Sequence, residues 1–257
     1  MNPIGTSASL MTVRWLGHAT ALISVDDVRV LTDPVLRPRI GPLVRTARPA
    51  DPAPLGRVDA ILLSHLHADH TDLPSLRRIG GSVPIVAPEP AASWLRRAGV
   101  SRVQEVRAGG ETSIQGLRVI ATEARHDARR RPFGPAAEPV GYLVRGSRSA
   151  YFAGDTDLFD GMADLGEALD VALLPVWGWG PSVGAGHLDP DRAAHAAQLI
   201  RPRAAIPIHW GTFARGRPWR RPADPAWPAR RFAALVADQA PTVAVHVLAP
   251  GEQIEVG

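Results

Sequence analysis

Ser64-His65-Leu66-His67-Ala68-Asp69-His70 is the stretch that decides the fold, and it directly follows the apolar run Ala60–Leu63. An apolar run of this length fits a buried strand and is too short for a helix. Four potential metal ligands, three of them imidazoles, therefore lie at the end of a strand. Divalent zinc binds histidine nitrogen and carboxylate oxygen, usually with three or four ligands. The heptapeptide predicts a metal site and comes close to supplying two half-sites.

The composition restricts the ligands to histidine and carboxylates. The 257 residues include nine histidines and no cysteine. This excludes a disulfide framework, a thiolate zinc site, an iron–sulfur cluster and a cysteine nucleophile. With 45% hydrophobic and 21% charged residues, the chain is long enough to bury a core without covalent staples. We expect a single domain over residues 1–257.

The charge pattern argues against nucleic acid as the partner. All 29 basic residues are arginine, the formal net charge is +4, and arginine clusters such as Arg129–Arg131 are scattered along the chain. Nucleic-acid binding usually shows a clustered basic stripe, so these arginines are interpreted as solvated surface residues. We expect a small-molecule substrate, and homo-oligomer formation is left open.

The sequence also predicts a cytoplasmic protein without a membrane span. No apolar run approaches the ~18–20 residues that a span needs. The segment Met1–Met11 lacks the basic and apolar regions of a secretory signal.

Short apolar runs separated by turn signals predict two groups of strands. The strands are expected at Val13–Leu16, Ala19–Val25, Val28–Leu31, Ala60–Leu63, Val83–Ala87, Val103–Val106, Glu111–Ile114, Leu117–Thr122, Val140–Val144, Ala150–Ala153, Asp170–Leu174, Ala204–Ile208 and Val243–Leu248. Helices are expected at Leu73–Ile79, Ala91–Ala98, Asp189–Ile200 and Trp227–Ala237, and the Pro-rich stretch Arg37–Arg57 is expected to be a surface loop. Strands and helices do not alternate strictly. We therefore expect an α/β (α+β) fold with two sheets face to face and helices outside.

Further candidate ligands follow later strands of this pattern. His126 follows Leu117–Thr122, Asp155 follows Ala150–Ala153, and His209 follows Ala204–Ile208. Taken alone, each has an ordinary explanation as a surface, turn or core residue. Their register with the heptapeptide favours a shared metal site.

An HxHxDH motif after a core strand, followed by a histidine, an aspartate and a last histidine, resembles the metallo-β-lactamase superfamily. This resemblance implies a four-layer αββα sandwich and covers essentially the whole chain. Trp15-Leu16-Gly17-His18-Ala19, Leu31-Thr32-Asp33-Pro34 and Gly186-His187-Leu188-Asp189-Pro190 are similar to the branch that contains L-ascorbate-6-phosphate lactonase and N-acyl-phosphatidylethanolamine phospholipase D.

The resemblance implies two divalent metal ions, with zinc expected and manganese or iron as alternatives. One ion would be held by His65, His67 and His126, the second by Asp69, His70 and His209, with Asp155 bridging both. A carboxylate can bridge metals ~3.5–4 Å apart, which a neutral imidazole cannot do. A metal-bridging hydroxide would then attack a small lactone, an ester or a phosphodiester.

Five other residues have expected roles around the metals. His18 and Asp33 would lie beside the metals and orient the ligands. His187 follows a glycine-rich loop and would stabilise the anionic oxygen that develops on the substrate, which makes it, with Asp69, a catalytic candidate. Trp177 and Trp179 would either pack in the core or line a substrate pocket.

Two other enzyme classes remain open at this point. The same fold carries iron-dependent oxidoreductases, such as sulfur dioxygenases, and nucleases that process RNA. The scattered arginines count against a nuclease, and metal analysis would separate a hydrolase from an oxidoreductase. A non-catalytic binding module is disfavoured because every ligand position is filled.

Overall fold

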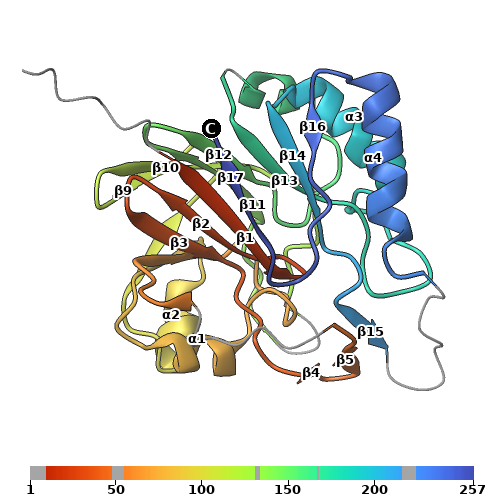
Figure 1. Ribbon diagram of the computed structural model, residues 1–257. Coiled ribbons are helices and arrows are strands. Elements are labelled where there is room, and N and C mark those ends of the chain that lie inside the picture. Colours follow the sequence, from red (N-terminus) through yellow and green to blue (C-terminus); the bar gives the residue numbers. More distant parts are fainter. Residues whose placement is uncertain (1–9, 48–54, 131–133, 167, 216–223) are drawn as a thin grey trace, which may run out of the picture.

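Two seven-stranded sheets packed face to face form the body of the protein (Figure 1). The computed structural model describes residues 10–47, 55–130, 134–166, 168–215 and 224–257. The first sheet has the order β17 (Gln253–Val256), β1 (Met11–Gly17), β2 (Thr20–Val25), β3 (Val28–Thr32), β6 (Ala60–Leu62), β7 (Ile85–Pro88) and β8 (Val103–Val106). The second has the order β16 (Ala244–Val245), β14 (Ala204–Ile208), β13 (Val171–Pro175), β12 (Ser149–Phe152), β11 (Val140–Arg145), β10 (Leu117–Glu123) and β9 (Glu111–Ile114).

Each sheet is antiparallel in one half and parallel in the other. In the first sheet, the strands from β17 to β3 pair antiparallel and those from β3 to β8 pair parallel. The second sheet repeats the pattern, antiparallel from β9 to β12 and parallel from β12 to β16. The expected mixed α/β architecture with two facing sheets is confirmed.

Helices cover the outer faces of the two sheets. Helices α1 (Leu73–Ile79) and α2 (Ala92–Arg97) lie on one flank, and α3 (Pro190–Ile200) and α4 (Trp227–Gln239) lie on the opposite flank (Figure 1). Asp189 caps α3 by accepting from the backbone N–H of Arg192 at 2.8 Å, and Pro190 occupies the first turn. The layer order is therefore helix, sheet, sheet, helix.

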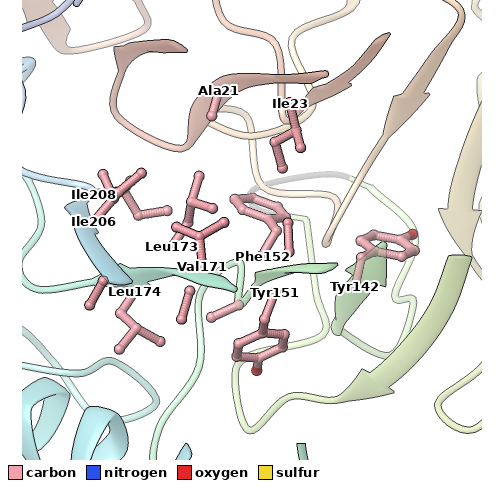
Figure 2. Packing of buried hydrophobic residues seen from close by; sticks show 14 of the residues in the cluster. Ala21, Ile23, Tyr142, Tyr151, Phe152, Val171, Leu173, Leu174, Ile206 and Ile208 are labelled. Carbon is pink, nitrogen blue, oxygen red and sulfur yellow. The ribbon is translucent and has the colours of Figure 1, made fainter. Parts of the chain in front are cut away.

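Alternating side chains of the first sheet fill two different cores. On β2, Ala21 and Ile23 join the core between the sheets, whereas Leu22 joins the core beneath α1 and α2. Successive side chains of a strand point to opposite faces, so a strand buried on both faces reads as an unbroken apolar run. Figure 2 shows the same alternation on β12 of the second sheet, where Phe152 points toward Ile23 and Tyr151 points to the opposite face.

Several expectations from the sequence are wrong in detail. The stretch Arg37–Arg57, expected to be a loop, contains β4 (Arg39–Ile40) and β5 (Leu43–Arg45), which form a small sheet with the unpredicted β15 (Phe213–Arg215). The expected strand Val243–Leu248 shrinks to β16, because only Ala244 and Val245 pair with β14. Strand β17 and a 3₁₀ helix at Asp160–Gly166 were not expected. Residues 48–54 of the stretch lie outside the described residues.

Candidate metal centre

The candidate ligands meet because they follow the carboxyl ends of strands from both sheets. His65, His67, Asp69 and His70 follow β6, while His126, Asp155 and His209 follow β10, β12 and β14. The backbone at this edge is unusual: His18, Asp33 and His209 have φ values of 54°, 34° and 66°. Left-handed backbone at a non-glycine residue costs about 1–3 kcal/mol and clusters at functional sites.

His65, His67 and His126 form the first group, with one nitrogen each within 4.8 Å of the others. The Nδ1 atom of His67 lies 3.0 Å from Nε2 of His126. The opposite nitrogen of His67 donates to the carbonyl of Arg129 at 3.0 Å, and that of His126 donates to the carbonyl of Gly186 at 2.7 Å. The two nitrogens that face each other are therefore unprotonated.

His18, Asp69, His70 and His209 form the second group, again with one ligand atom each within 4.8 Å of the others. The Nε2 atoms of His70 and His209 lie 3.1 Å apart. His209 donates from Nδ1 to the carbonyl of Trp177 at 2.7 Å, and His70 donates from Nδ1 to Asp33 Oδ2 at 2.7 Å. Both imidazoles thus aim Nε2 at the centre of the group.

Asp155 stands between the two groups. Its Oδ2 lies 3.1 Å from Nε2 of His70, 3.9 Å from that of His126 and 4.0 Å from that of His65. Its Oδ1 lies 3.2 Å from Nε2 of His209. Asp155 therefore has a carboxylate oxygen close to histidine nitrogens of both groups.

The donor atoms fit divalent cations. Within the described residues, His65 Nε2 and Asp155 Oδ1 are buried without a hydrogen-bond partner. Ser64 Oγ donates to Asp33 at 2.5 Å and accepts from His65 Nδ1 at 2.9 Å, which leaves His65 Nε2 as a lone pair. An unpaired buried acceptor costs about 1–3 kcal/mol, and the facing lone pairs of His67 Nδ1 and His126 Nε2, 3.0 Å apart, repel each other. A cation satisfies both groups of donors.

Burial keeps most of these imidazoles neutral. It lowers the pKa of His65 well below its ordinary value, lowers that of His209 to about 3, and lowers those of His67 and His126. A neutral imidazole is the form that binds a metal. For Asp155 and Asp69, burial opposes ionisation, but the neighbouring histidines outweigh it and hold the pKa of each carboxyl well below its usual range.

His70 behaves differently from the other histidines. Burial disfavours its charged form, but Asp155 and Asp33 face its two nitrogens and raise the pKa of His70 well above its ordinary value. When the ring is charged, the added proton is on Nε2, which faces Asp155 and His209, because Nδ1 already donates to Asp33. This proton occupies the position from which His70 would bind a metal.

His18 and Asp33 sit beside the candidate ligands. His18 Nε2 lies 3.1 Å from Asp69 Oδ2, and His18 also offers a nitrogen to the second group. Asp33 anchors the heptapeptide through both carboxylate oxygens. Its Oδ1 accepts from the backbone N–H of Ser64 at 2.7 Å, and its Oδ2 accepts from His70. Sequence reasoning missed Ser64, although it lies in the deciding heptapeptide.

His187, Trp177 and Trp179 also reach the centre. His187 Nε2 lies 3.5 Å from Asp155 Oδ2, and 27% of its side chain is exposed. Burial lowers the pKa of His187, but the hydrogen bond and charge of Asp155 outweigh it and raise the pKa overall. The indole of Trp179 donates to Asp69 Oδ2 at 3.1 Å.

Arg130 was wrongly interpreted as a solvated arginine of the Arg129–Arg131 cluster. Its guanidinium donates to the carbonyls of Leu66 and Thr71, at 2.5 and 3.0 Å, and stacks on the ring of Trp94. It thus holds both ends of the ligand loop. Its position in an arginine-rich run hid this role, and Arg131 lies outside the described residues.

The comparisons with known proteins agree with this geometry. Residues 28–210 match the family described as Beta-lactamase superfamily domain. A UPF0173 metal-dependent hydrolase of Methanopyrus kandleri is 34% identical over 255 residues, which cover 95% of this chain and 100% of that protein. One of Thermofilum pendens is 35% identical over 254 residues, covering 95% and 98%.

Among solved structures, the metallo hydrolase Igni18 of Ignicoccus hospitalis superposes with a TM-score of 0.73 at 25% identity, covering 97% of this chain and 99% of that one.

None of the helices in the described part of the chain has the length and apolar character to cross a membrane. Membership of the lactonase-like branch stays a prediction. The chain belongs to the metallo-β-lactamase superfamily, as a metal-dependent hydrolase of the UPF0173 family.

Proposed function

We propose that the protein is a dinuclear hydrolase that acts on a small lactone, an ester or a phosphodiester. His65, His67 and His126 would hold one divalent cation, Asp69, His70 and His209 the second, and Asp155 would bridge the two. The observation that carries the proposal is the orientation of the imidazoles. Each of the five donates outward from one nitrogen to a carbonyl, a hydroxyl or a carboxylate and turns the other nitrogen inward.

This outward bonding is how proteins orient metal-binding histidines. A partner on the far nitrogen fixes the tautomer and the ring plane and makes the near nitrogen more basic. Without cysteine, histidine and carboxylate ligands suit zinc, and manganese and iron are the alternatives. Two bound divalent cations would supply Lewis acidity, polarising a substrate oxygen and making water acidic enough to attack at neutral pH.

The remaining residues position the ligands and the substrate. Asp33 holds the ring of His70, and His18 and Trp179 both contact Oδ2 of Asp69, so they restrict where that carboxylate can point. His187 is partly exposed and lies beside Asp155. From there it can donate a hydrogen bond to the oxygen that becomes negative as the substrate is attacked.

An iron-dependent oxidoreductase on the same fold is the second candidate. Histidine and carboxylate ligands suit iron as well as zinc, so the donor set leaves this candidate open. Iron in the natively purified protein, together with oxygen consumption, would favour it over hydrolysis. A nuclease is disfavoured by the scattered arginines, and it would reveal itself by RNA binding that weakens steeply with salt.

Elemental analysis and a substitution at Asp155 test the proposal. The fully loaded protein should contain two metal equivalents and hydrolyse members of a panel of lactones, esters and phosphodiesters. Asp155→Asn should retain at most one equivalent and lose hydrolysis. Asp157→Asn is the matched control, because this neighbouring carboxylate pairs with Arg192 instead of the candidate ligands.

Two results would overturn the assignment. A single equivalent in the fully loaded wild-type protein would defeat the dinuclear site. Full hydrolysis by Asp155→Asn would show that Asp155 does not bridge.

A further inference from the structure

An aromatic cavity of about 700 Å³ lies beside the metal centre. Its walls come from β15, from the segments that follow β5, β13 and β14, from the start of α4 and from the segment before β17. Of the described residues, five aromatic side chains line it: Trp177, Trp179, Trp210, Phe213 and Trp227. Cavities of about 300–1,000 Å³ are the usual size for sites that enclose a small organic ligand.

The cavity shares its walls with the second group of candidate ligands. Trp179 lines the cavity and donates from its indole to Asp69 at 3.1 Å. The carbonyl of Trp177 accepts from His209 at 2.7 Å, and the ring of Phe213 meets that of His18 edge-on at 5.2 Å. The rings of Trp179 and Phe213 therefore contact the second group and also line the cavity. A substrate held at the second group would lie next to this cavity.

The lining chemistry selects an apolar occupant. Among the described lining residues, only Arg215 and Asp224 carry charge. Asp224 pairs with Arg230, and the guanidinium of Arg215 lies over the ring of Trp179 at 5.0 Å. Sugar hydroxyls or a phosphate would lose water against these walls with few polar groups to replace it. Aromatic walls instead favour an aromatic guest, which they contact edge-on or in an offset stack.

We propose that this cavity, which we call the aromatic pocket, receives an uncharged aromatic substituent of the substrate. The inference rests on the proposed hydrolase function and narrows its substrate class to lactones or esters that carry an aryl group. Polar sugar-phosphate lactones fall outside this class. Trp227 is the wall that can be changed with least damage, because it is 48% exposed and meets Trp177 edge-on at 5.4 Å.

Binding of 2-naphthol, measured by calorimetry on the metal-loaded protein, tests the pocket directly. The compound should bind saturably, and glucose, which offers only hydroxyl groups, should not. Trp227→Ala should raise the Kd for 2-naphthol about tenfold, because it removes one aromatic wall. Trp227→Phe should restore most of the affinity. Val247→Ala, at a 38% exposed residue outside the lining, should leave it unchanged. Absence of saturable binding, or an unchanged Kd in Trp227→Ala, would overturn the inference.

Hydrolysis of two matched lactones separates the pocket from the reaction. The kcat/KM for γ-phenyl-γ-butyrolactone should exceed that for γ-butyrolactone at least tenfold, and Trp227→Ala should abolish only this preference. If neither lactone is hydrolysed but naphthol binding depends on Trp227, the pocket stands and the lactone part of the proposed function is wrong. If both are hydrolysed with equal kcat/KM, the hydrolase stands and the pocket assignment is wrong, whatever the binding result.

Discussion

Replacing Asp33 with asparagine should weaken the metal site of His70 more than the other metal site. Asp33 is fully buried, and its oxygens accept from the backbone of Ser64 at 2.7 Å, from the hydroxyl of Ser64 at 2.5 Å and from His70 Nδ1 at 2.7 Å. Asparagine has the same shape but places an NH₂ group where one oxygen stood. Where the NH₂ group replaces Oδ2, it faces two donors, the hydroxyl of Ser64 and Nδ1 of His70. His70 must then adopt the other tautomer, with its proton on Nε2.

A proton on Nε2 removes the lone pair that would bind the second metal. Loss of a partner that orients a metal-binding histidine typically costs 10–100-fold in metal affinity, or about 1.4–2.7 kcal/mol. The site of His65, His67 and His126 depends on Asp33 only indirectly, through the hydroxyl of Ser64, which donates to Asp33 and accepts from His65 Nδ1. The metal equivalent at this site should therefore lose less affinity than the one at His70.

Competition against a chromophoric chelator measures the two affinities separately. Asp59→Asn serves as the control, because Asp59 is also a buried aspartate but bonds Arg29 and Gln115 away from the site. Circular dichroism establishes that both variants are folded. Wild-type affinity for both equivalents in Asp33→Asn would refute the tautomer argument.

Three further predictions follow from other features of the site. His187→Ala should keep both metal equivalents and lose about 10²–10³ in turnover; loss of a metal equivalent would make His187 a ligand, and unchanged turnover would remove it from the mechanism. Because Asp155 and Asp33 raise the pKa of His70 well above its ordinary value, metal binding should displace a proton from His70, and metal affinity should rise with pH. Calorimetry in two buffers of different ionisation enthalpy checks this, and a buffer-independent enthalpy would contradict it. Gly154→Ala should lower the free energy of unfolding by about 2–5 kcal/mol, since the new Cβ would lie 2.5 Å from Ser64 Cβ at a φ of 62°. Gly41→Ala, with a φ of 52° and open space around it, should lose only the backbone part in the same urea titration.

The arrangement of the candidate site could be predicted because its residues are in register with strand ends. Each strand that carries a candidate ligand has a short apolar run that is visible in the sequence, and the polar residue after it lands at the sheet edge. The structure brings together all seven candidate ligands, with His18, Asp33, His187, Trp177 and Trp179 around them. Their roles as ligands and catalytic groups stay predictions, as does their division between two metals.

What the sequence does not reveal depends on pairing between distant residues. Strand β15 exists because Phe213 and Arg215 pair with Arg45 and Leu43, far away in the chain. Strand β17 likewise is only four residues long, alternates exposed polar with apolar residues, and is defined by its partner β1. The role of Arg130 depends on carbonyls of another loop, and no local pattern marks it.

The pairing of β1 with β17 also bears on how the chain folds during synthesis. Met11 pairs with Val256, far away in the chain, so β1 waits for β17 before this edge is covered. At about 5–20 residues per second, that wait lasts on the order of 10–50 s. Throughout it, one edge of β1 offers unpaired N–H and C=O groups to any neighbouring chain. The first sheet can therefore close this edge only after β17 has been made, which is later than the synthesis of the last candidate ligand, His209.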